Sequence, residues 1–264
     1  MGQDLRLMFN MEMENYDRFR PRYVPEMFRD VMAYAGQPGR ALEIGIGTGQ
    51  ATQPFLDADW NVTAVELGEG LAQFCEAKFG AYPKFGVMHC AFEDAPLGEG
   101  AFDLVYSATA FHWIAPEAGL PKVLQILRPG GAFAWITNYP APSEAHVHIH
   151  EALQQVYRDH GEYFGNPPPL NLAERRRDVI AKGERSAELL RSYGFGDVGL
   201  RHYSGVRRFN AQDYVALLHT YSDHRSLPDA ARIPFMARMA GVIEERGGMI
   251  ELEDTVTLVL GRKP

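Results

Sequence analysis

The sequence predicts an α/β fold in which a doubly wound, mostly parallel sheet carries helices on both faces. An apolar run, Ala41–Gly49, breaks into alternating glycines, as at a strand that turns into a helix. Strand-like and helix-like segments then alternate as far as Thr137. Alternation of this kind implies parallel strands joined by crossover helices.

The glycine-rich turn is the most informative of these features. Leu42 and Ile44 suit a buried strand, and Gly45, Gly47 and Gly49 follow. Glycine has no Cβ, so it adopts positive φ freely and lets the backbone approach a ligand closely. Such a turn, between a buried strand and a helix N-terminus, is typical of a site for a nucleotide-like cofactor.

The spacing around the turn bears on which cofactor would bind. A dinucleotide fingerprint requires a glycine three residues after the second one, where this chain has Gln50. Glu66 lies 21 residues beyond Gly45, close to the spacing of about 20 residues expected for an acid that binds a ribose. The alternatives are a tight turn without a ligand and a solvated strand end.

The other elements of the core follow in order. Turn residues and apolar runs predict a helix over 52–59 and strands over Asn61–Glu66, Lys84–Cys90 and Phe102–Ser107. A helix over Pro121–Leu127 ends at Arg128–Gly131, and a fifth strand covers Ala132–Thr137.

Composition narrows the class of protein. The 264 residues are 46% hydrophobic, enough for one large core or for a core with a cap. A net charge of −8 argues against a broad interface with nucleic acid, so a small-molecule substrate is expected. The basic triplet Arg175–Arg177 is most simply the solvated face of a helix.

The N-terminal residues, the length of the apolar runs and the cysteine count predict the cellular compartment. Met1–Asp4 does not begin a signal peptide, and no apolar run approaches the length of a membrane span. Cys75 and Cys90 are too few for a disulfide framework or a zinc site. A cytoplasmic protein without membrane contact is therefore expected, as a monomer or a homodimer.

Several motifs in one order support a family assignment. Glu43 precedes the glycines, Glu93–Leu97 leads into Gly100–Val105, and Leu127–Gly131 forms a helix-to-strand turn. Ser107–Ile114 runs from small residues into His-Trp. In this order the motifs resemble class I S-adenosylmethionine-dependent methyltransferases of the small-molecule branch, such as methyltransferase type 11 and the trans-aconitate methyltransferases. The resemblance covers residues 12–137 well and is loose beyond.

The resemblance implies a Rossmann-like, seven-stranded, mostly parallel sheet with an antiparallel terminal hairpin and helical cap insertions. We expect one domain over 1–264, with an N-terminal helical lid (1–38), a cofactor-binding core (39–138) and caps at 139–185 and 205–250. Val198–Tyr203 would pair with Asp254–Leu260 in the hairpin, after a helix that begins at Ser186 and ends at Gly194.

The implied cofactor is S-adenosyl-L-methionine, with S-adenosyl-L-homocysteine as product. Many relatives have an aspartate before the adenine loop, whereas this chain has Ala91 and Phe92 there. Adenine recognition would fall to Phe92 or to Glu93, although Glu93 also fits a solvated loop. The expected cofactor-binding residues are Tyr16, Arg20, Glu43, Gly45, Gly47, Thr48, Gly49, Gln50, Glu66, Leu67, Phe92, Glu93, Ser107, Ala108 and His112.

The N-terminal lid carries two of these residues. Relatives have a similar Tyr-x-x-x-Arg-Pro-x-Tyr run, which implies a helix over the methionine end of the cofactor. Tyr16 would cover the methyl channel, and Arg20 would meet a carboxylate of the methionine or of an acidic acceptor. An amphipathic helix with arginines in solvent is the alternative.

Methyl transfer from a sulfonium is an in-line displacement, which requires positioning more than a nucleophile. His112 is the candidate base, because it follows the fourth strand and an unperturbed imidazole titrates near neutral pH. The alternative is that His112 only orders its loop. Tyr16 is a second catalytic candidate, and the expected acceptor-site residues are Tyr23, Trp113, Tyr221, Ser222 and His224.

The caps offer one further pattern. Pro140–Pro142 and Pro167–Pro169 bracket a predicted helix from Glu144 to about His160, which contains His146, His148 and His150. On a helix His146 and His150 share a face, a spacing that can bind metal. Without a convincing acidic or cysteine partner, a partly exposed helix start is expected instead and no metal is predicted. The stretch 211–247 is predicted helical.

Together these features favour methyl transfer from S-adenosylmethionine to a small molecule, with a carboxylate as one candidate acceptor. Two alternatives stay open. A nicotinamide-dependent oxidoreductase is disfavoured by Gln50 and by the terminal hairpin, and a cofactor-binding protein without activity would show the same motifs.

Overall fold

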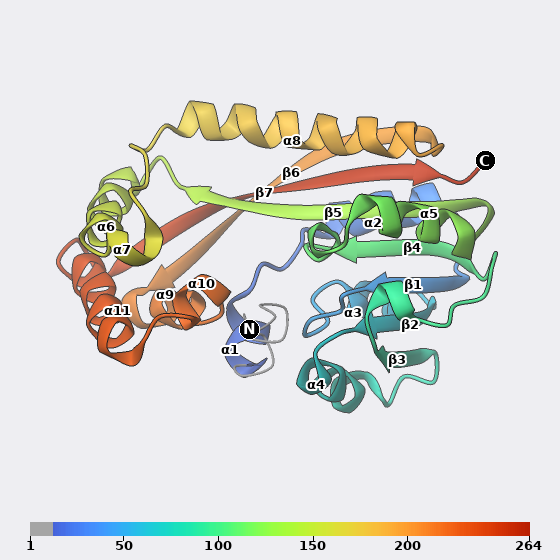
Figure 1. Cartoon of the computed structure of the whole chain (residues 1–264), viewed down its shortest axis with the longest axis horizontal. Helices are drawn as coiled ribbons and strands as arrows, with labels where there is room; N and C mark the ends of the chain where they lie inside the picture. Colours follow the sequence, from blue (N-terminus) through green and yellow to red (C-terminus); the bar gives the residue numbers. More distant parts are fainter. Residues whose placement is uncertain (1–12) are drawn as a thin grey trace.

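Seven strands form one sheet in the order β3-β2-β1-β4-β5-β7-β6 (Figure 1). The computed structural model describes residues 13–264. Residues 1–12 of the predicted lid (1–38), which include Met1–Asp4, lie outside the described residues. Strands β3, β2, β1, β4 and β5 run parallel to one another, whereas β7 is antiparallel to both β5 and β6. The predicted fold class is therefore confirmed. The strands are β1 (Arg40–Ile44), β2 (Asn61–Glu66), β3 (Phe85–His89), β4 (Phe102–Ala108), β5 (Leu127–Pro142), β6 (Gly196–Asn210) and β7 (Met249–Arg262).

Helices connect the strands and cover both faces of the sheet (Figure 1). They are α1 (Met13–Phe19), α2 (Pro25–Ala35), α3 (Thr52–Asp57), α4 (Glu69–Phe79), α5 (Pro116–Ile126), α6 (Val147–Asp159), α7 (Gly161–Phe164), α8 (Leu172–Ser192), α9 (Ala211–Leu218), α10 (Ser222–Arg225) and α11 (Asp229–Glu244). Two short 3-10 helices, η2 (Phe92–Asp94) and η3 (Phe111–Trp113), follow β3 and β4.

Alternation along the strands creates two apolar layers. Ala41 and Ala64 point to one face, where α2 and α3 pack, and their neighbours Leu42 and Val65 point to the other, where α5 and α8 pack. All four side chains are at most 1% exposed. The central strands are thus buried on both faces, as expected of parallel strands with crossover helices.

A third apolar cluster lies outside the sheet proper. Side chains of α1, α6, α9 and α11 pack there against the far ends of β6 and β7, including Leu217, Phe235 and Ile250. Figure 1 shows these helices gathered at the ends of the long strands, away from β3. The cluster therefore forms a helical cap beside the carboxyl ends of β1 and β4.

Strand β5 is longer than predicted. Pairing with β4 ends at Ile136, but pairing with β7 continues to Pro142, so the predicted boundary at Pro140–Pro142 lies inside the strand. Beyond Ile136 only β7 borders β5 among the described strands, so one side of β5 is an edge there, where a proline without an N–H is tolerated. The sequence pattern misses the extension because β7 supplies the pairing.

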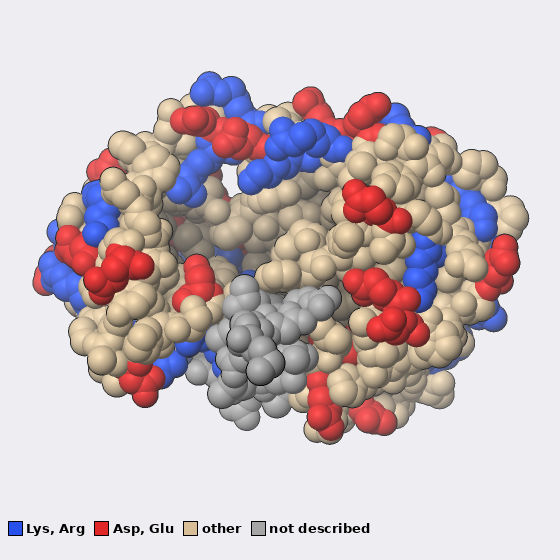
Figure 2. Space-filling view, in the orientation of Figure 1, with Lys and Arg blue, Asp and Glu red and all other residues tan. Residues whose placement is uncertain are grey.

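Helix α8 also exceeds its predicted length. It begins at Leu172 rather than near Ser186, because Asn171 caps it by accepting a hydrogen bond from the Glu174 backbone N–H. Arg175–Arg177 are exposed on this helix, as predicted, and Figure 2 shows basic and acidic side chains interspersed along it. Within residues 13–264, no helix has both the length and the apolarity needed to cross a lipid bilayer.

Candidate functional site

The glycine-rich turn connects β1 to α3 in the conformation that the sequence predicts. Gly45, Gly47 and Gly49 all have positive φ, at 70°, 59° and 82°. A Cβ at Gly49 would lie 2.2 Å from the Phe79 ring, and one at Gly45 would lie 2.5 Å from the Ala110 Cβ. Glycine is therefore required at both positions by backbone conformation and by space.

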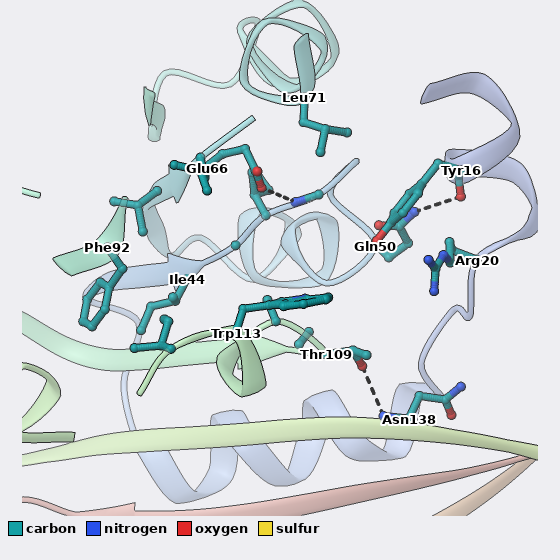
Figure 3. A pocket seen from close by; sticks show the side chains of 18 of the residues that line it. Tyr16, Arg20, Ile44, Gln50, Glu66, Leu71, Phe92, Thr109, Trp113 and Asn138 are labelled. Atoms are coloured by element: carbon teal, nitrogen blue, oxygen red, sulfur yellow. Dashed lines mark hydrogen bonds between the residues drawn. The ribbon is translucent and has the colours of Figure 1, made fainter. Parts of the chain in front are cut away.

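Glu66 stands beside this turn at the end of β2. Its side chain accepts a hydrogen bond from the Gly47 backbone N–H at 3.0 Å (Figure 3) and another from the Gly68 backbone N–H at 2.9 Å. Glu66 is only 7% exposed, and burial raises the pKa of its carboxyl, although the two backbone hydrogen bonds act in the opposite direction. A carboxylate has about four lone-pair sites, so acceptor capacity is left for a ligand.

A pocket opens at the carboxyl ends of β1, β2, β4 and β5, between the sheet and α1. Ligands of open α/β sheets bind at this edge. Of the residues predicted from sequence, those that line it are Tyr16, Arg20, Tyr23, Gly45, Gly47, Gln50, Glu66, Leu67, Phe92, Glu93, Ala108, Trp113 and Tyr221. Residues that the sequence reasoning did not single out also line it, among them Pro21, Ile44, Leu71, Cys90, Thr109, Asn138 and Pro140.

One end of the pocket is apolar. Ile44, Val65, Phe92 and Ile114 line it, and Phe92 is 4% exposed with the Lys122 ammonium 5.3 Å from its ring centroid. Trp113 is 39% exposed and lies across the pocket from Glu66 in Figure 3. A flat aromatic group would be held there by packing.

The other end lies under α1 and is cationic and aromatic. The Arg20 guanidinium lies between two rings, 4.7 Å from the Tyr16 centroid and 4.6 Å from the Tyr221 centroid. It also donates to the Thr220 carbonyl at 2.9 Å. Lys78 joins α1 to the glycine turn, because its ammonium bonds both Asp17 and the Thr48 carbonyl. Residues of the described N-terminal segment thus line this end of the pocket.

Four predicted cofactor residues lie behind the lining. Thr48 and Gly49 are buried within the turn. Ser107 is buried on β4, and its hydroxyl donates to the Ile44 carbonyl at 2.9 Å. Glu43 is 1% exposed and accepts from the hydroxyls of Thr52 and Tyr106 at 2.6 and 2.9 Å. In this geometry these residues support the turn and do not border the pocket.

The environment of Glu43 gives a pH prediction. Burial raises its pKa from 4.5 to about 8, so its contribution to folding is full below pH 4.5 and is lost as pH rises to 8. Glu43→Gln keeps an oxygen to accept from Thr52 and Tyr106. We expect it to flatten the decline of the unfolding midpoint over this range, measured by thermal denaturation. The exposed Glu69→Gln is the control, and an unchanged slope in Glu43→Gln would contradict the assignment.

The three remaining residues predicted for the cofactor or acceptor site also do not line the pocket. His112 is exposed over part of its surface, with its ring 4.9 Å from that of Trp113, and partial burial together with repulsion from Arg20 lowers its pKa. His224 is buried in the cap, where it pairs with Asp223 at 2.7 Å and with the Tyr157 hydroxyl at 2.8 Å. Ser222 begins α10 beside it.

The histidines of the cap are held by local contacts. His150 bonds the Glu251 carbonyl at 2.7 Å, and the His146 imidazole lies 3.8 Å from the Glu251 carboxylate. Among residues 13–264, no three or more His, Cys, Asp or Glu side chains are grouped so as to hold a metal ion.

Residues 42–135 match the family model described as a methyltransferase domain, and they span β1 to β5 with the glycine turn and Glu66 inside. This stretch of the chain is similar to a methyltransferase domain. An uncharacterized methyltransferase of Mycobacterium tuberculosis is 30% identical over 136 residues, which cover 52% of this chain and 54% of that protein. A malonyl-[acyl-carrier protein] O-methyltransferase of Paenibacillus is 27% identical over 132 residues, 46% of each chain. The chain thus spans about half the length of these curated relatives.

Solved structures of other proteins share the fold of this chain. A putative type II methyltransferase from Anaeromyxobacter dehalogenans is 21% identical and has a TM-score of 0.66, covering 93% of this chain and 98% of that one. Phosphoethanolamine N-methyltransferase 2 of Haemonchus contortus, solved with S-adenosyl-L-methionine, is 14% identical with a TM-score of 0.53. It covers 97% of this chain and 57% of that one. The predicted family resemblance and Rossmann-like fold are both confirmed.

Proposed function

We propose that this chain transfers a methyl group from S-adenosylmethionine to a small-molecule acceptor. The observation that carries the proposal is the buried Glu66 carboxylate beside the Gly47 backbone, within a matched methyltransferase domain. A carboxylate placed there can accept from both hydroxyls of a ribose, and charge-assisted hydrogen bonds are the stronger kind.

The residues present fit the cofactor along its length. The ribose would bond Glu66, and the adenine would pack against Phe92 and Leu67 at the apolar end. The methionine portion would lie along the backbone of the turn at Gly45 and Gly47, which lines the pocket and can approach a ligand closely. Support also comes from the Haemonchus structure, which holds this cofactor in the same fold.

The bound cofactor would supply an electrophilic methyl group on a sulfonium. The protein's own task is then to orient the acceptor and to exclude water. Tyr16, Tyr23, Trp113 and Tyr221 form aromatic walls around the space beyond the turn. Such walls displace solvent and hold a small molecule in one orientation.

An anionic acceptor suits this space. The Arg20 guanidinium is fixed between Tyr16 and Tyr221, and a guanidinium recognises carboxylates through paired hydrogen bonds. The name of the Paenibacillus relative points the same way, because a malonyl group carries a carboxylate. We therefore place carboxylates first among the acceptors to be screened.

Calorimetric titration with S-adenosylhomocysteine, with NADH as the competing candidate, tests the proposal. Binding of S-adenosylhomocysteine alone supports it, and binding of NADH alone would replace it with a nicotinamide-dependent oxidoreductase. Tight binding without turnover of any carboxylate would instead favour a catalytically silent cofactor-binding protein.

His112 gives a separate prediction about catalysis. Its lowered pKa keeps the imidazole neutral near pH 7, as a base requires, but its ring does not border the pocket. If it acts as a base after the acceptor binds, His112→Ala lowers turnover by roughly 100-fold and leaves cofactor affinity unchanged. Steady-state kinetics and calorimetry separate the two quantities. Full turnover in the variant would limit His112 to packing against Trp113.

A further inference from the structure

Asn138 is a buried amide at the floor of the pocket, at the carboxyl end of the predicted fifth strand. It is 6% exposed, and its side-chain N–H donates to the Asp254 carboxylate at 2.8 Å. A carboxylate that accepts this hydrogen bond fixes which way the amide is turned. Asn138 Oδ1 then has no hydrogen-bond partner among residues 13–264.

The orientation of this amide is held from behind. Arg207 bonds both carboxylate oxygens of Asp254, one of them at 2.8 Å, and also donates to the Phe19 carbonyl at the end of α1 at 2.9 Å. With the carboxylate fixed in this way, the amide nitrogen of Asn138 stays on Asp254 and the oxygen stays available.

A pair of hydroxyls lies next to this amide. The Tyr23 hydroxyl and Thr109 Oγ1 are 2.9 Å apart, and Thr109 Oγ1 also accepts from the Asn138 backbone N–H at 3.1 Å (Figure 3). The two hydroxyls carry two hydrogens, and their mutual bond uses one. Whichever of them donates to the other, one hydroxyl hydrogen remains available for a ligand.

The backbone beside Asn138 has an unusual conformation at Thr109. Thr109 has a φ of 57°, a conformation that is a genuine outlier for a β-branched residue. Strain of this kind persists where the surrounding structure imposes it, and it gathers at functional sites. Buried acceptors without partners are also rare in folded proteins. The positive φ of Thr109 and the unpartnered Asn138 Oδ1 both occur in residues that line the same pocket.

We propose that Asn138, Thr109 and Tyr23 form a subsite for a hydroxyl group of the methyl acceptor. The hydroxyl gives its hydrogen to Asn138 Oδ1 and accepts the remaining hydrogen of the Tyr23–Thr109 pair. With Arg20 in the same pocket, the preferred class of acceptor is a small hydroxylated carboxylate. This inference rests on the proposed function, because it assigns the acceptor end of the same site.

Matched probes that differ by one hydroxyl test the subsite. Lactate against propionate, and malate against succinate, are titrated by calorimetry into the full chain saturated with S-adenosylhomocysteine. We expect the hydroxylated member of at least one pair to bind about tenfold more tightly, because the site's buried polar groups are unpaired without it. Equal affinities within both pairs, or no binding of either hydroxy acid, would overturn the proposal.

Variants assign the preference to Asn138. Asn138→Leu should abolish the discrimination and keep the affinity for S-adenosylhomocysteine, whereas Thr137→Val, on the opposite face of β5, should change neither. If Asn138→Leu does not fold, the double variant Arg207→Met/Asp254→Asn replaces it, because it leaves neither member of the buried ion pair charged, and the amide introduced at position 254 can donate to Asn138 Oδ1 and occupy the acceptor. Discrimination that survives the variant would contradict the subsite. Failure of the wild type to bind S-adenosylhomocysteine would contradict the proposed function itself.

Discussion

Glu66→Ala is expected to weaken S-adenosylhomocysteine binding by roughly 100-fold. The variant removes the acceptor of two ribose hydroxyl hydrogens, and hydrogen bonds to a charged group contribute about 1.5–3 kcal/mol each. Two such bonds, less the cost of desolvating the carboxylate, correspond to a loss of about 3 kcal/mol, and each 1.4 kcal/mol is a factor of ten. Calorimetric titration measures the change directly.

The experiment has to separate lost ligand contacts from a disturbed turn. Glu66 holds the backbone N–H groups of Gly47 and Gly68, so the alanine variant also loosens the turn. Glu66→Gln keeps the shape and one acceptor oxygen, and it should lie between wild type and Glu66→Ala in affinity. The exposed Glu69→Ala controls for the lost charge. Unchanged affinity in Glu66→Ala would remove this residue from the cofactor site.

The core of the fold could be predicted because its signals are local. The predicted strand Asn61–Glu66 has the same bounds as β2, because an apolar run between turn residues marks both ends of a strand. The glycine turn is also predicted from local residues, because positive φ angles favour glycine and this turn has three of them. Glu66 followed from its spacing to that turn.

What the sequence could not predict depends on contacts between distant segments. The extension of β5 past Thr137 arises from pairing with β7, more than a hundred residues later. Thr109 gives no sign in the sequence of its positive φ, and the partners of its hydroxyl, Tyr23 and the Asn138 backbone N–H, come from segments distant in the sequence. Asn138 did offer a signal, since a polar residue directly after a predicted strand lies at the ligand-binding edge of a parallel sheet.

Asp254→Ala is expected to destabilise the protein by about 3–5 kcal/mol, the cost typical of breaking a buried ion pair by removing one partner. The side chains of Asp254 and Arg207 are only 7% and 17% exposed, so solvent compensates poorly for the lost partner. The variant leaves the guanidinium and the Asn138 amide without their common acceptor. Chemical denaturation monitored by circular dichroism measures the change in unfolding free energy.

A double variant shows where this cost originates. In Arg207→Met/Asp254→Ala no buried charge is left, so we expect recovery of at least half of the lost stability, as when a buried ion pair is replaced by apolar groups. The exposed pair Arg191–Glu188 gives a matched control, whose disruption by Glu188→Ala should cost less than about 1 kcal/mol. A double variant as unstable as Asp254→Ala would mean that Asp254 acts mainly through Asn138. In that case the ion pair would matter chiefly for aiming one amide into the pocket.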